Sequence, residues 1–149
     1  MILSNFKVFP RTGRLIGIDW GARRTGVAVT DDSRGFVFTR SPILPHNSAE
    51  LVRAVVDLAV AERAVGIVIG LPLRMDETES ETTARVREFA DALAVATDIP
   101  IIFIDETLSS TAAQEEMGRV RPRDIKEKLD SNAARVILEN AIALLKRNN

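Results

Sequence analysis

Residues 15–29, Leu-Ile-Gly-Ile-Asp-Trp-Gly-Ala-Arg-Arg-Thr-Gly-Val-Ala-Val, decide the fold class of this chain. The first apolar run ends in a carboxylate, Asp19, and a second apolar run starts at Gly26, after a short turn that holds two arginines. Two short apolar runs separated by such a turn predict a pair of adjacent strands. A strand that ends in an acid beside a tight basic turn suits chemistry on phosphates, because the carboxylate can hold a divalent cation.

The composition restricts the class of protein. The chain has 149 residues, the length of one domain, and 46% of them are hydrophobic, enough to form a core. It has no cysteine, which excludes disulfides and thiolate metal sites, and no apolar run approaches the ~20 residues of a membrane span. We therefore expect a cytoplasmic protein with no membrane partner. The net charge of −1 argues against purely electrostatic binding of nucleic acid.

The spacing of apolar residues predicts an α/β domain. Strands are expected over residues 15–19, 26–30, 36–40, 65–70 and 100–104, and helices over 48–64, 80–96, 111–117 and 130–146. Three strands joined by short turns, followed by two right-handed crossovers, give a five-stranded mixed sheet with helices on both faces. Residues 1–13 are expected to form an N-terminal extension, and residues 14–149 a single domain.

Acidic residues follow two of the predicted strands and open the last predicted helix: Asp19, Asp105, Glu106 and Asp130. Ligands of open α/β sheets bind beyond the carboxyl ends of the strands, where several carboxylates together would form a magnesium site. Asp105 and Glu106 point to opposite faces if the strand continues, so only one is expected in the site, and we favour Glu106. If the parallel strands follow the first strand in sequence order, one strand separates those that carry Asp19 and Glu106. The longer glutamate side chain and the metals between must then bridge roughly 10 Å.

Each feature taken alone also has a structural explanation. Asp130 is suited to be a helix N-cap, and the basic run over residues 119–128 is typical of a solvated surface. Trp20 is expected to pack in the core rather than stack on a base, and Gly70 can be a strand terminator. His46 lies in a predicted loop and is not expected to be catalytic. The joint placement of the acids at three matching points of the topology favours a functional site.

Four motifs, in order along the chain, resemble those of the YqgF (RuvX) family. Residues 17–28 match the family pattern G-x-D-x-G-x-[KR]-R-x-G-V-A. Val-Ile-Gly-Leu-Pro-Leu at 68–73, Asp-Glu-Thr-Leu-Ser-Ser at 105–110 and Asp-Ser-Asn-Ala-Ala at 130–134 continue the match. Each motif alone is weak, and their order and spacing together make the resemblance specific.

The resemblance implies a ribonuclease H-like fold with strand order 3-2-1-4-5, related to Holliday-junction resolvases. It implies a nuclease that uses one or two Mg²⁺ or Mn²⁺ ions on structured RNA and processes the 5′ end of precursor 16S rRNA in ribosome biogenesis. Asp19, Glu106 and Asp130 match the family's catalytic and metal-binding acids. Basic side chains would bind the phosphates: Arg23, Arg24, Arg119, Arg121, Arg123, Lys126 and Lys128. We further expect association with the ribosome, and a monomer or weak homodimer.

Three departures from the family pattern are visible. Thr107 replaces an arginine, Glu139 replaces a glutamine, and the loop over residues 75–81 is acidic and lacks glycine. If the missing arginine contacts the scissile phosphate in the family, Arg24 is a candidate to supply that contact here. Alternatives stay open: a non-catalytic ribosome- or RNA-binding module, and a Holliday-junction DNA resolvase, which would need a two-fold dimer. A sugar-kinase-like protein would need two such domains.

Overall fold

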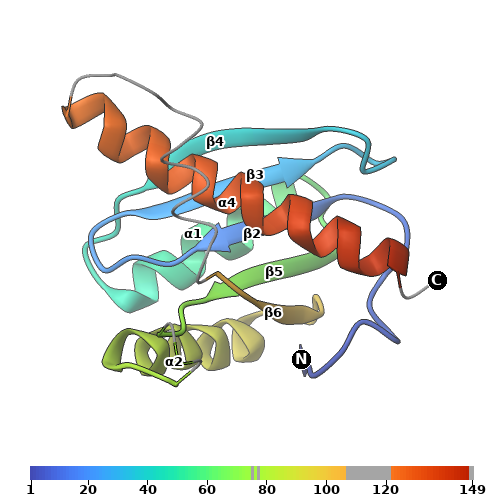
Figure 1. Ribbon diagram of the computed structural model, residues 1–149, viewed down its shortest axis with the longest axis horizontal. Helices are drawn as coiled ribbons and strands as arrows, with labels where there is room; N and C mark the ends of the chain where they lie inside the picture. Colours follow the sequence, from blue (N-terminus) through green and yellow to red (C-terminus); the bar gives the residue numbers. More distant parts are fainter. Residues whose placement is uncertain (75, 77, 107–121, 148–149) are drawn as a thin grey trace.

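A single mixed sheet forms the centre of the molecule (Figure 1). The computed structural model describes residues 1–74, 76, 78–106 and 122–147, and the side chains among these except those of residues 122–131. The strands are β1 (Ile2–Leu3), β2 (Leu15–Asp19), β3 (Thr25–Thr30), β4 (Val37–Ile43), β5 (Gly66–Leu71) and β6 (Ile101–Asp105). They lie in the order β1-β6-β5-β2-β3-β4. β2, β3 and β4 pair antiparallel, whereas β2, β5, β6 and β1 pair parallel.

The helices cover both faces of this sheet: α1 (Ser48–Ala61), α2 (Glu81–Ala96) and α4 (Pro122–Arg147). In Figure 1, α4 crosses one face, which we name the α4 face, and α1 and α2 lie on the other, the α1–α2 face. Side chains alternate along each strand. Ile16 and Ile18 of β2 therefore belong to the core beneath α1 and α2, and Leu15 belongs to the core beneath α4.

A glycine sets how closely α4 approaches the sheet. A Cβ atom on Gly17 would lie 2.8 Å from the carbonyl oxygen of Ala134 and 2.5 Å from Cγ of Leu138. Such distances are shorter than van der Waals contact, so only glycine lets the helix backbone pack directly on β2. Gly17 of β2 therefore also fixes the position of α4, the helix that carries Asp130.

The predicted strand order 3-2-1-4-5 is confirmed, but the predicted number of strands is wrong. β1, from the segment expected to precede the domain, pairs with β6 and makes a sixth strand. Phe9 of the same segment is 2% exposed and packs in the core of the α4 face. The third predicted strand also lies later than expected, over Val37–Ile43.

The start of the last helix differs from the prediction too. α4 begins at Pro122 rather than at Asp130. Proline suits the first turn of a helix, because the amide hydrogen it lacks has no acceptor there. The segment expected to be a basic connector is therefore helical from residue 122 onward. The short helix predicted over 111–117 lies outside the described residues. None of the described helices is long and apolar enough to cross a membrane.

Candidate nuclease site

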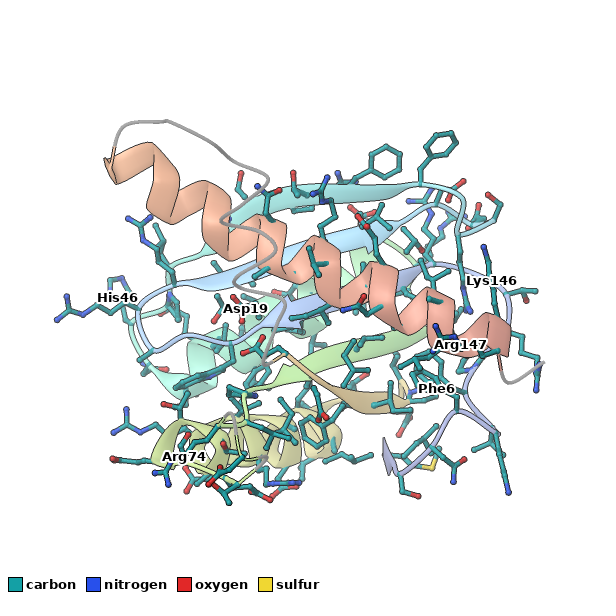
Figure 2. All side chains as sticks on the ribbon, viewed as in Figure 1. Phe6, Asp19, His46, Arg74, Lys146 and Arg147 are labelled. Atoms are coloured by element: carbon teal, nitrogen blue, oxygen red, sulfur yellow. The ribbon has the colours of Figure 1, made fainter. Side chains whose placement is uncertain are left out.

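Asp19 and Glu106 come together on the α4 face, beyond the carboxyl ends of β2 and β6. Asp19 is the last residue of β2, and its neighbour Ile18 faces the opposite core, so Asp19 projects toward α4. Figure 2 labels it at the end of that strand. Glu106 follows the last residue of β6, and its backbone N–H donates to the carbonyl oxygen of Leu71 at 3.2 Å. This bond extends the ladder between β5 and β6 by one residue and holds the backbone of Glu106 in place.

Gly70 explains how the two acids meet although β5 lies between their strands. A Cβ atom on Gly70 would overlap the Glu106 carboxylate, with the Cδ atom only 3.1 Å away, and would also collide with Ile137 of α4. The Glu106 side chain thus occupies the space that any other residue at position 70 would fill. It crosses above β5 toward Asp19 beneath α4. The sequence predicted that the longer glutamate side chain would help to bridge this distance. It missed the role of Gly70, a glycine near the end of the buried strand between two acid-bearing strands.

The pairing perturbs the ionisation of Glu106 strongly. Burial, the negative charge of Asp19 and a side-chain hydrogen bond with Asp19 together raise the pKa of Glu106 from 4.5 to about 10. Burial is the largest of these causes, because it removes water from the charged carboxylate. Without a cation, the two carboxyl groups therefore share a proton at neutral pH. Clustered acids with such a shift are typical of functional sites.

A divalent cation fits this pair chemically. Hard cations such as Mg²⁺ and Mn²⁺ take carboxylate oxygens as ligands, and a positive ion would relieve the repulsion that raises the Glu106 pKa. Among the side chains that the structure describes, no three acids or histidines gather as a metal site. In the described part of the chain, the candidate metal site therefore contains two acids, Asp19 and Glu106.

Asp130 lies within α4 and not at its start, which corrects its predicted role as a helix-opening residue. It precedes Ala134 by one helical turn, or about 6 Å along the axis. Ala134 packs over Gly17, and the amino-terminal half of α4 extends past the end of β2 where Asp19 lies (Figure 1). The backbone of Asp130 thus lies one turn before the point where α4 contacts β2 at Gly17, while its side chain lies outside the described residues.

Arg23 and Arg24 follow the acid Asp19 closely in the chain, whereas Asp105 and His46 lie apart from the acid pair. Arg23 is exposed and Arg24 half-buried in the β2–β3 loop, directly after Asp19. The hydroxyl group of buried Thr25 fixes this loop by donating to the carbonyl oxygen of Gly21 at 3.1 Å. Asp105 is exposed and separate from the acid pair, as its alternation with Glu106 predicts. His46 is exposed at the periphery (Figure 2).

The predicted basic residues of the last segment fall into two groups. Arg123, Lys126 and Lys128 belong to the first turns of α4, on its described backbone, with side chains outside the description. Arg119 and Arg121 lie outside the described residues, as does Thr107. Glu139, which replaces the family's glutamine, is described and pairs with Arg135 one turn earlier, with 3.4 Å between Nε and Oε1.

Sequence comparisons relate most of this chain to known proteins. The sequence profile of the family described as "RuvX: Holliday junction resolvase" matches residues 13–144. A protein of Maridesulfovibrio salexigens named "Putative pre-16S rRNA nuclease" is 36% identical over 132 residues, which cover 87% of this chain and 98% of the relative. A protein of the same name from Rickettsia canadensis is 31% identical, with 99% of each chain covered.

Solved structures show the same fold. The Thermus thermophilus RuvC in complex with a Holliday junction substrate superimposes with a TM-score of 0.58 at 11% identity, covering 91% of this chain and 96% of that one. The yeast mitochondrial Holliday junction resolvase Ydc2 gives a TM-score of 0.52 at 10% identity, covering 95% and 83%. The fold is therefore ribonuclease H-like, of the RuvC type, as the resemblance implied. Together with the profile match and the sequence relatives, these findings establish that the chain belongs to the RuvX family.

Proposed function

We propose that this protein is a metal-dependent nuclease that hydrolyses phosphodiester bonds of structured RNA and processes the 5′ end of precursor 16S rRNA. The observation that carries the proposal is the meeting of Asp19 and Glu106 above Gly70. The printed names of the sequence relatives support the choice of substrate. In this proposal the enzyme acts in the cytoplasm on the precursor ribosome, as a monomer or weak homodimer.

The acids have defined roles in this proposal. Asp19 and Glu106 hold one or two Mg²⁺ or Mn²⁺ ions on the α4 face, and Asp130 is the third acid, contributed by the helix that covers this face. A divalent ion at such a site supplies positive charge at the scissile phosphate and lowers the pKa of the attacking water. Gly70 keeps open the space through which Glu106 reaches the site. The nearby core of α4 and β5 excludes water from one side of the acid pair.

Basic residues bind the substrate backbone in this proposal. Arg23 and Arg24 lie in the β2–β3 loop that follows Asp19. Arg123, Lys126 and Lys128 lie in the first turns of α4. Arg119 and Arg121 precede that helix. Arginine forks bind phosphate oxygens in pairs and so orient the scissile bond. Because the whole chain carries a net charge of only −1, these local clusters rather than the overall charge would attract RNA.

The test is a cleavage assay with a precursor 16S rRNA fragment in Mg²⁺, Mn²⁺ or EDTA. We expect cleavage that needs the metal and falls at least about 100-fold in Asp19→Asn and Glu106→Gln. Glu62→Gln is the matched control, because Glu62 is a half-buried acid at the other end of β5 and should leave cleavage unchanged. Metal-dependent cleavage that persists in Asp19→Asn would refute the mechanism.

A second candidate substrate is a four-way DNA junction, since the matching family is described as a Holliday junction resolvase. The same assay includes such a junction beside the RNA. Cleavage of the junction in symmetric pairs, with the RNA left intact, would replace the RNA proposal by the resolvase. If the RNA binds equally well with the metal and in EDTA and is never cut, both nuclease proposals would give way to a non-catalytic RNA-binding module.

A further inference from the structure

A cavity of about 420 Å³ lies on the α1–α2 face, beside the loop that follows β2. Its apolar lining includes Trp20, Leu51 and Phe89, and its polar lining includes Asn47, Arg85 and Glu88. Leu51 and Phe89 are 3% and 5% exposed, whereas Trp20 is half-buried. A concave apolar site of this size with a few polar groups is typical of a small-ligand pocket.

The cavity and the acid pair are joined by the backbone of β2. Asp19 projects to the α4 face and the next residue, Trp20, packs toward the core of the α1–α2 face. Gly21 and Ala22 line the cavity as well, so it adjoins the edge of the sheet where β2 ends. A polynucleotide with one phosphate at Asp19 could pass over this edge and place a neighbouring nucleotide in the cavity.

We infer that this cavity receives an unpaired nucleobase of the RNA, stacked on Trp20; the inference rests on the proposed nuclease function. Structured RNA is recognised mostly through unpaired bases that stack on aromatic rings and bond through their edges. Asn47 and Glu88 supply a donor and an acceptor for such an edge. The cavity thus selects RNA in which a base near the cut is not paired.

The polar lining is held by local contacts. The side-chain oxygen of Asn47 accepts from the backbone N–H of Glu50 at 2.8 Å as the N-cap of α1, which leaves its amide nitrogen to donate. Arg85 pairs with Glu81 at 3.3 Å, one turn earlier in α2, at the rim of the cavity. Arg85 and the positive end of α1 are suited to the phosphate that flanks the inserted base.

The intrinsic fluorescence of the protein reports directly on this site, because Trp20 is the only tryptophan and the chain has no tyrosine. The probe is an RNA duplex with one bulged nucleotide, titrated in EDTA so that nothing is cut. The comparison is the same duplex with an abasic residue at the bulge. We expect the bulged base to quench Trp20 and to tighten binding about tenfold over the abasic duplex. Equal quenching and equal affinity for the two duplexes would overturn the inference.

A pair of substitutions in α2 separates the cavity from the rest of the surface. Ala92 is exposed and lines the cavity, so Ala92→Phe fills part of it, whereas Asp19 does not belong to the lining. Val95 in the same helix is 90% exposed and does not contribute to the lining, so Val95→Phe is the matched control. Ala92→Phe should abolish the tenfold preference for the bulged base, whereas Val95→Phe should retain it. Retention of the preference in Ala92→Phe would contradict the inference.

The two proposals can fail separately, because binding in EDTA does not need hydrolysis. Base-dependent quenching without any cleavage would support the cavity and refute the nuclease. Cleavage that needs metal and Asp19, together with equal binding of the bulged and abasic duplexes, would support the nuclease and refute the cavity. A Trp20→Phe variant, followed with a dye on the RNA, should keep most of the preference, and Trp20→Leu should lose it, since stacking needs an aromatic ring.

Discussion

Two glutamates at opposite ends of β5 have opposite electrostatic surroundings. Glu62 lies between the end of α1 and the start of β5, and two arginines neutralise it. Its carboxylate lies 3.1 Å from Nη1 of Arg14 and 3.2 Å from Nε of Arg40. Glu106 lies beyond the other end of β5, where its neighbour is a second acid, Asp19, and its pKa is raised to about 10.

The difference separates what stabilises the fold from what the proposed function needs. At the amino ends of β2 and β5, the protein supplies the countercharges itself, and no external ion is required. At the carboxyl ends, buried acids repel each other until a proton or a cation joins them. A folded chain keeps such an arrangement only where the rest of the structure compensates for it, as in functional sites.

Apart from removing the acids themselves, the largest expected effect on cleavage comes from closing the gap at Gly70. Gly70→Ala places a methyl group where the Glu106 carboxylate and Ile137 lie, so it should move Glu106 away from Asp19. We expect metal-dependent cleavage to fall about 10- to 100-fold, as for changes that displace a metal ligand. The overlap with Ile137 should also cost about 1–3 kcal/mol of unfolding free energy.

Gly66→Ala is the control for that substitution, because it changes the same residue type at the other end of β5. A Cβ atom there would lie 2.5 Å from Cζ of Phe9 and 2.8 Å from Cδ2 of Leu15, far from the acid pair. It should therefore cost stability without a selective loss of cleavage. Equal losses of cleavage in correctly folded Gly66→Ala and Gly70→Ala would show that the gap at Gly70 has no special role.

A smaller effect is expected in the pH dependence of stability without metal. Between about pH 4.5 and about pH 10, Glu106 binds more protons in the folded than in the unfolded chain, so its contribution lowers stability as the pH rises. Glu106→Gln removes this contribution. Urea unfolding in EDTA should show that the variant gains stability over the wild type, and that the gain grows from pH 6 to pH 9. A gain that stays constant over this range would mean that the folded-state pKa of Glu106 is not raised.

The smallest effect is expected at Glu62. Glu62→Gln removes the charge shared by Arg14 and Arg40, whose side chains are 37% and 40% exposed, so water screens most of the loss. We expect a loss of about 1 kcal/mol, which would lower Tm by roughly 2–4 °C in a thermal melt. If Glu62→Gln lowers stability by more than Gly70→Ala does, the proposed difference between the two ends of β5 would be reversed.

Apolar alternation and strand ends are local signals, so the sequence sufficed for the five main strands and for the two acids at their ends, whereas the order of the strands followed from the family resemblance. It did not predict β1, since two residues at the edge of a sheet become a strand only through their long-range partners Ile101 and Ile102. The start of α4 was missed because the run over residues 119–128 is basic and polar and contains Pro122, whereas proline is also compatible with the first turn of a helix.

The meeting of the two acids could likewise be predicted only in part from the sequence. Strand order placed Asp19 and Glu106 one strand apart, and the sequence predicted only that the longer glutamate side chain and metals would bridge them. The answer depends on Gly70, whose missing side chain matters only once β5 is known to lie between β2 and β6. The cavity beside Trp20 likewise depends on how α1 and α2 pack together, which the spacing of apolar residues does not determine.

The most direct test of the account is calorimetric titration of Mn²⁺ into the wild type, Glu106→Gln, Asp19→Asn and Glu62→Gln. The acid pair at the carboxyl ends of β2 and β6 should bind the ion, so we expect saturable binding in the wild type and in Glu62→Gln. Binding should be at least about tenfold weaker in Glu106→Gln and Asp19→Asn. Unchanged affinity in these two variants, with the fold intact, would contradict the claim that Asp19 and Glu106 form the metal site.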